Sequence, residues 1–147
     1  MININCKTIP IVFIFCVSLF FISTNYCEGA DAKEDLISYI KEVSSIITNV
    51  DITIRSIGFN TLPIKEGVRR MNVYIGQTKS IKYPKVLSRQ YTMILLSFKK
   101  LRAGLLLLSL EKKDIAVRVI KSGTQLLKYA AKDILAIADK EGIRKKQ

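Results

Sequence analysis

The chain has 147 residues, with 24 lysines and arginines against 12 aspartates and glutamates, and its formal net charge is +12. It contains no histidine, which removes the commonest general base and a usual zinc ligand. The three cysteines, Cys6, Cys16 and Cys27, all precede residue 30, so the rest of the chain has neither a thiol nucleophile nor a disulfide. The composition argues against an enzyme and predicts no metal or cofactor.

The first 29 residues are typical of a secretory signal peptide. Lys7 adds positive charge near the start, residues 9–22 are uncharged and apolar, and residues 23–30 are mostly small or polar. Such a run matches the apolar part of a signal peptide, about 7–15 residues, and is shorter than the roughly 20 residues that span a bilayer. We expect cleavage near Gly29 and secretion of the remainder, with an uncleaved anchor as the alternative.

A helix is predicted from about residue 31, with its end between residues 50 and 58 left open and Gly58 as a natural stop. The apolar residues recur at alternating steps of four and three, which places them on one face. They are Leu36, Ile40, Val43, Ile47, Val50, Ile54 and Ile57. Residues 50–54 also alternate as a β-strand does, but no second strand is evident to pair with them, so a helix is preferred.

A second helix is predicted between the Thr61-Leu62-Pro63 corner, where Thr61 can cap it, and Tyr83-Pro84. Its inner face comprises Ile64, Val68, Met71, Ile75 and Thr78. Gly67 and Gly76 each lower its helix propensity by about 1 kcal/mol relative to alanine. Near its start, Glu66 is expected to pair with Arg69 or Arg70; the less favoured interpretation is a buried catalytic acid.

The third predicted helix, residues 84–110, has the strongest apolar pattern, a seven-residue repeat. Its core positions are Leu87, Tyr91, Ile94, Phe98, Leu101, Leu105 and Leu108. A fourth helix is predicted from a cap at Asp114 to about Lys140, with Gly142 as its stop. Its inner face comprises Ala116, Ile120, Leu127, Ala130, Ile134 and Ile137.

Four amphipathic helices with short connections predict an all-α fold, an up-and-down antiparallel bundle. We expect one domain over residues 30–142, followed by a short basic tail at residues 143–147.

Basic residues on the last two helices form the first candidate site, a face for an anionic partner. Its members are Lys85, Arg89, Lys99, Lys100, Arg118, Lys121, Lys128 and Lys132. If the outer faces of the two helices adjoin, these side chains form one basic wall. The alternative is an ordinary solvated face, because lysines must lie opposite any amphipathic core.

The second candidate site is an apolar patch on the third helix, formed by Leu96, Leu107 and Leu110. These residues lie off the core stripe, on the lysine-bearing side. An exposed apolar patch among basic residues marks a binding or membrane site. Burial in the centre of the bundle is the preferred interpretation, because a small domain without disulfides needs the buried area.

No motif identifies a family, and by analogy of architecture alone the chain is like a short secreted effector or salivary-type protein. The leading hypothesis is a non-enzymatic interaction protein that binds an acidic protein, a sulfated glycan or an anionic lipid surface. Nucleic acid is disfavoured, because aromatic residues are not interleaved with the basic ones. The alternatives are a carrier of lipids or small apolar ligands and a cationic membrane-active protein.

Overall fold

A computed structural model of the protein describes residues 30–143. They form four α-helices, α2 (Ala30–Gly58), α3 (Ile64–Ser80), α4 (Ser88–Ser109) and α5 (Lys113–Lys140), and a short 3₁₀ helix, η2 (Lys85–Leu87). The described residues contain no strand, and residues 50–54 continue α2. The all-helical prediction is therefore confirmed. The predicted leader, residues 1–29, and residues 144–147 of the predicted tail lie outside the described residues.

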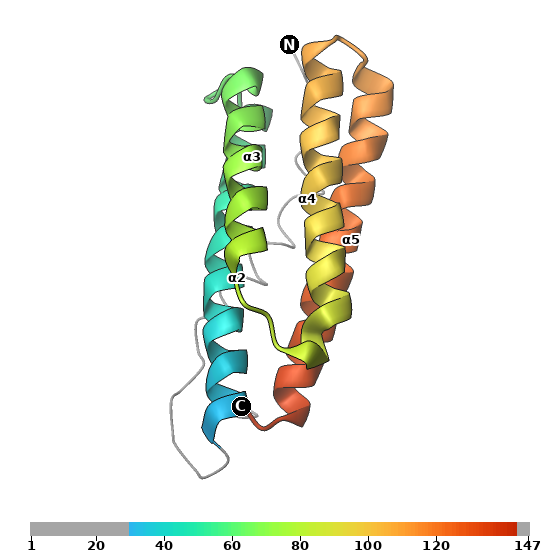
Figure 1. The fold of residues 1–147 in the computed structure, drawn as a ribbon. Helices are drawn as coiled ribbons and strands as arrows, with labels where there is room; N and C mark the ends of the chain where they lie inside the picture. The colour runs from blue at the N-terminus through green and yellow to red at the C-terminus, as the bar shows by residue number, and fades with distance from the viewer. Residues whose placement is uncertain (1–29, 144–147) are drawn as a thin grey trace.

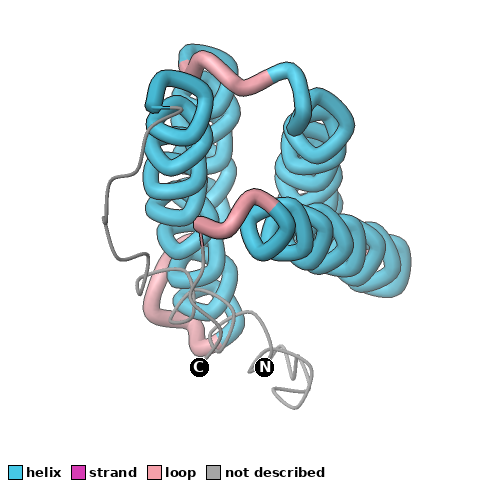
Figure 2. Tube along the Cα trace, turned by 90° about the horizontal axis from the view of Figure 1, so that it is seen from below, coloured by secondary structure: helices cyan, strands magenta, loops and turns pink. Residues whose placement is uncertain are grey.

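Consecutive helices run in opposite directions (Figure 1), so that the chain rises along α2, descends along α3, rises along α4 and descends along α5. The α2 and α3 helices lie on one side of the molecule, and α4 and α5 lie together on the other. Figure 2, an end-on view, shows these helices joined by short loops. The most extensive pairing is that of α4 with α5, followed by that of α3 with α4.

The core is formed largely by the apolar stripes that the sequence predicts, although of the predicted inner face of α3 only Met71 and Thr78 are buried, and Tyr39 of α2 lies off its predicted stripe. On α2 every stripe residue except Ile54 is buried, and Ile54 packs against the core from its edge. On η2 and α4 the seven-residue repeat is buried except at Tyr91, which is half-buried. The largest fully buried side chains, Tyr39, Phe98, Ile40 and Met71, come from three helices. Burial of these side chains is the main stabilising term for a domain without disulfides.

Small residues allow α4 and α5 to approach each other closely. A Cβ atom added at Gly104 would collide with Cγ1 of Ile120 and lie 3.3 Å from the carbonyl oxygen of Ala116. A Cβ atom at Gly123 would lie 3.1 Å from the carbonyl oxygen of Ser97. The contact line between α4 and α5, called the seam below, therefore has no room for a side chain at Gly104 unless Ile120 moves, and only tight room at Gly123.

Three helices end in the same backbone arrangement, a residue with positive φ followed by a hydrogen bond back across the last turn. The positive-φ residues are Asn60 after α2, Glu111 after α4 and Gly142 after α5. Gly142 matches the predicted stop. The amide of the next residue, Ile143, donates to the carbonyl oxygen of Ala138 at 2.9 Å, and its side chain is buried. The packed domain thus includes the residue just beyond 142.

Two predicted helix caps are wrong. The Thr61 hydroxyl donates a 3.0 Å hydrogen bond to the carbonyl oxygen of Ser56, so it closes the end of α2, and Pro63 occupies the cap position of α3. The α5 helix begins at Lys113, so Asp114 lies in its first turn and Lys112 occupies the cap position. Asp114 still places negative charge near the positive end of the α5 dipole.

Candidate functional site

The three ion pairs of the described residues all lie on α2 and α3. Within α2, Nε of Arg55 lies 2.9 Å from Oδ2 of Asp51. Burial raises the pKa of the Asp51 carboxyl, and the smaller opposite effect of Arg55 does not cancel this rise. The other two ion pairs join Glu66 to Arg69 and Arg70.

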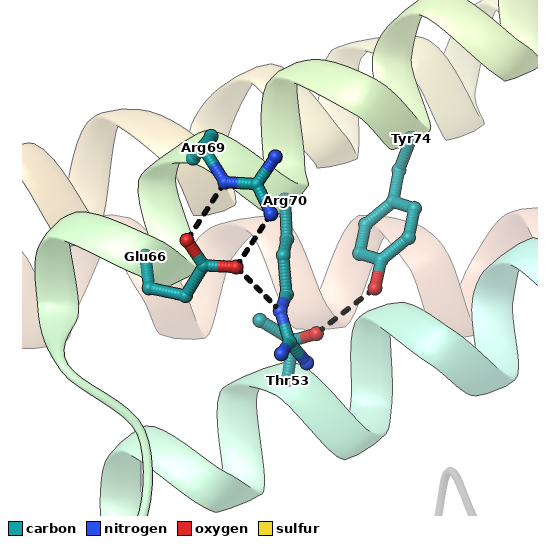
Figure 3. A network of polar contacts seen from close by, with 5 residues as sticks. All are labelled: Thr53, Glu66, Arg69, Arg70 and Tyr74. Atoms are coloured by element: carbon teal, nitrogen blue, oxygen red, sulfur yellow. Dashed lines mark hydrogen bonds and ion pairs between the residues drawn. The ribbon is translucent and has the colours of Figure 1, made fainter.

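Glu66 is held by both arginines (Figure 3). Nε and Nη2 of Arg69 donate to its two carboxylate oxygens at 2.7 and 2.8 Å, and Nε of Arg70 donates at 3.0 Å. These hydrogen bonds lower the pKa of Glu66 to about 2, and Arg69 makes the largest contribution. The predicted pairing is therefore confirmed, and a half-buried, strongly ionised carboxylate is poorly suited to act as a general acid.

None of the cations of α4 and α5 forms an ion pair with another described residue, whereas the arginines of α2 and α3 all do. The lysines of α2 and α3 form no ion pair within the described part of the chain either. Lys85 is exposed on η2, Arg89 is exposed in the first turn of α4, and Lys99 is exposed midway along α4. Lys100 is half-buried, and its Nζ donates a 2.8 Å hydrogen bond to the hydroxyl of Ser122 on α5. Lys100 thus lies across the α4–α5 pair.

The predicted basic residues of α5 form a stripe on its outer side. Arg118, Lys121 and Lys132 are exposed and Lys128 is half-buried. At 100° per residue, the stripe lies roughly opposite Gly123, the residue that faces α4. These four residues are called the α5 stripe below, and the side of the helix pair that Lys100 crosses lies between them and Lys99.

The preferred interpretation of the predicted apolar patch, burial in the centre of the bundle, is wrong for two of its three residues, because Leu96 and Leu110 lie on the flank of α4 that no described helix covers. Leu96 is 46% exposed and Leu110 is 65% exposed, whereas Leu107 is half-buried and packs against the core. Two α5 residues that the sequence analysis did not include, Ile115 and Tyr129, are 47% and 55% exposed. Ile115 and Tyr129 each lie seven residues from Ser122, as Leu96 and Leu110 each lie seven residues from Ala103. This spacing places each pair on one helical face and is the signal by which the sequence could have revealed Ile115 and Tyr129.

The side chains of the described part of the chain contain no group of three acidic, histidine or cysteine residues placed to hold a metal ion. No helix among the described residues is long and apolar enough to cross a membrane. On α4 and α5 the exposed side chains offer charge attraction by lysine and arginine and apolar contact by leucine, isoleucine and tyrosine.

Comparison of the chain with protein families, with curated proteins and with solved structures found no match. Its function must therefore be inferred from its own residues.

Proposed function

We propose that this protein is a small secreted interaction protein, without enzymatic activity, that binds an acidic partner through the basic residues of α4 and α5. Residues 1–29 serve as its cleaved signal peptide. The observation that carries the proposal is the contrast between the two sides of the bundle. Carboxylates engage every arginine of α2 and α3, namely Arg55, Arg69 and Arg70, whereas neither the arginines nor the lysines of α4 and α5 have such a partner among the described residues.

Unpaired exposed cations favour binding of an anion in two ways. Their positive potentials add, because no described carboxylate forms an ion pair with them, and this attracts anionic partners from a distance. No intramolecular ion pair has to be broken when a partner binds. Such binding weakens with added salt, since exposed charges are screened over about 8–10 Å at physiological ionic strength.

Charge reversal on the α5 stripe tests the proposal. The variant Lys121→Glu/Lys128→Glu/Lys132→Glu is compared with Lys33→Glu/Lys41→Glu/Lys79→Glu, which changes the net charge equally on α2 and α3, where all three lysines are exposed. The salt concentration that elutes each variant from immobilised heparin is measured, and circular dichroism verifies the fold. We expect the α5 variant to lose retention and the control to keep most of it. Equal losses would show that only net charge matters.

A further inference from the structure

Two rows of side chains flank the seam on the same side of the α4–α5 pair. Each row advances in steps of seven residues, so its members share one helical face. The rows are Leu96, Ala103 and Leu110 on α4, and Ile115, Ser122 and Tyr129 on α5. Lys100 lies one turn beyond Leu96, next to the α4 row, and it donates a hydrogen bond to Ser122 in the α5 row. The two rows therefore lie on the same side of the helix pair. We call this side the paired-row face.

The paired-row face points away from α3. The opposite flank of α4 carries Phe98 and Leu105, which are fully buried, and Leu105 lies against Gly67 of α3. No described element covers the paired-row face to the same degree, since Leu96, Leu110, Ile115 and Tyr129 are all exposed. Folding therefore leaves four large apolar side chains in solvent on one side of two adjacent helices.

Cations border the paired-row face on both edges. Lys99 lies at its α4 edge, the α5 stripe lies at its α5 edge, and Lys100 crosses its middle. Acidic residues occur near its ends, Asp133 beside Lys132 and Glu111 and Asp114 beside two lysines of the α4–α5 turn. The border is thus basic along most of its length.

Exposed apolar residues also occur on α2, after α2 and on α3, where Ile52 is 51%, Phe59 61% and Val73 45% exposed. There the arginines are engaged by carboxylates. Among the described residues the lysines of α2 and α3 are unpaired too, but the α4–α5 side combines exposed apolar rows on two adjacent helices with unpaired cations along both borders. Apolar contact bordered by lysine and arginine is the pattern by which helices lie on anionic membrane surfaces.

We infer that the paired-row face docks on an anionic lipid surface, with the leucines, Ile115 and Tyr129 entering the headgroup boundary and the bordering cations contacting lipid phosphates and carboxylates. This inference rests on the proposed function and specifies its partner. A second copy fits less well, because it would bring the basic borders and Lys100 of two chains together. A partner helix fits less well because Lys100 lies across the groove that such a helix would occupy.

Vesicle sedimentation tests the inference with the chain expressed in full. Vesicles of phosphatidylcholine with phosphatidylserine are compared with vesicles of phosphatidylcholine alone. The variant Leu96→Gln/Leu110→Gln/Ile115→Gln is matched with Ile52→Gln/Phe59→Gln/Val73→Gln, which removes the same kind of side chain at similar exposure from the other side. We expect the native chain and the matched control to bind the anionic vesicles, and the paired-row variant to need about tenfold more lipid.

A fluorescence measurement provides a second test, which needs only one substitution at an exposed position. The chain contains no tryptophan, so Leu110→Trp introduces a single reporter on the paired-row face and Ile52→Trp introduces one on α2. On addition of phosphatidylserine vesicles, we expect the emission of Leu110→Trp to shift to shorter wavelength and that of Ile52→Trp to stay unchanged.

The outcomes separate this inference from the proposed function. Retention on heparin without binding to anionic vesicles would overturn the lipid inference and leave the proposed function intact. Equal vesicle binding by the paired-row variant and its control, or an unshifted Leu110→Trp emission, would also overturn it. A dimer in solution that the paired-row variant dissociates would assign the face to a second copy. Loss of both heparin and vesicle binding after charge reversal of the α5 stripe alone would support both proposals.

Discussion

The Ser97 hydroxyl on α4 donates a 2.8 Å hydrogen bond to the carbonyl oxygen of Gly123 on α5, and both residues are buried. Seven residues further along α4, Gly104 lies against the carbonyl oxygen of Ala116, seven residues before Gly123 on α5. The two contacts repeat in antiparallel register. They fix the seam, and so determine which side chains of α4 and α5 face solvent.

The first prediction concerns Gly104→Ala. The added Cβ atom meets the backbone oxygen of Ala116 and Cγ1 of Ile120. Cγ1 is bonded to the branched Cβ atom of Ile120, so it cannot move unless the whole side chain moves. We expect the free energy of unfolding to fall by about 1–3 kcal/mol in spite of alanine's higher helix propensity. Chemical denaturation followed by circular dichroism measures the change.

The matched control is Gly76→Ala in α3, because nothing lies within 4 Å of the position of its added Cβ atom. Relief from the low propensity of glycine should raise the free energy of unfolding by about 1 kcal/mol. If Gly104→Ala stabilised the protein as Gly76→Ala does, α4 and α5 would be far enough apart at Gly104 to hold a Cβ atom.

The second prediction concerns Glu111, which has a positive φ of 61° at the end of α4. Its amide donates to Leu108, and the amide of Lys112 donates to Leu107, as the helix-ending arrangement requires. A left-handed conformation costs a residue with a Cβ atom about 1–2 kcal/mol, and glycine avoids that cost. We expect Glu111→Gly to raise the thermal midpoint and Glu111→Ala to leave it nearly unchanged. A drop with glycine would refute this account of the turn.

Periodicity predicted the helices and the core well, because burial of an apolar stripe depends on residue spacing within one helix. Burial of Leu36 and Phe98 is an example. The stop at Gly142 was predicted from the residue type, because glycine adopts a positive φ at a helix end. The caps were mispredicted, because Thr61 can donate to a preceding carbonyl oxygen as readily as it can cap a following helix.

The candidate site depends on the register between two helices, which periodicity within one helix does not specify. Lys100 looked like one of several equivalent outer lysines, yet the close approach at Gly123 brings it within hydrogen-bonding distance of Ser122. The same register places Ile115 and Tyr129 beside the predicted leucines. The role of Gly104 and Gly123 as contact residues was the missing information.

The third prediction concerns acid stability and Glu66. Its folded pKa of about 2 lies below its usual value of 4.5, so the folded state binds this proton less readily than the unfolded state. The stabilisation is therefore fully present above about pH 5 and is lost as pH falls through 4.5 towards 2. The difference in unfolding free energy between the native chain and Glu66→Gln should shrink over this range. Glu34→Gln, at an exposed position on α2, serves as the control.

An NMR titration of the Glu66 side-chain carboxyl checks the same prediction directly. A midpoint near that of an ordinary glutamate would show that the two arginines do not hold Glu66 in solution, whatever the stability difference.

The fourth prediction concerns Tyr39, which is buried on α2 although its hydroxyl has no hydrogen-bond partner among the described residues. An unpaired buried hydroxyl costs about 1–3 kcal/mol, so Tyr39→Phe should stabilise the protein at neutral pH. The contrasting variant is Tyr74→Phe, which loses the 3.2 Å contact between the Tyr74 and Thr53 hydroxyls and should destabilise by about 1 kcal/mol.

Alkaline pH separates this account from a simple packing effect. Burial, with smaller contributions from Tyr91 and Tyr83, raises the pKa of Tyr39 above its usual value of 10.0. Because the folded state keeps the proton that the unfolded state releases, the native chain should lose stability as pH rises through about 10. Tyr39→Phe removes this dependence, so its stability advantage should grow above that pH, as measured by denaturation at pH 8 and pH 11. A constant advantage would mean that the Tyr39 hydroxyl reaches solvent in the folded protein.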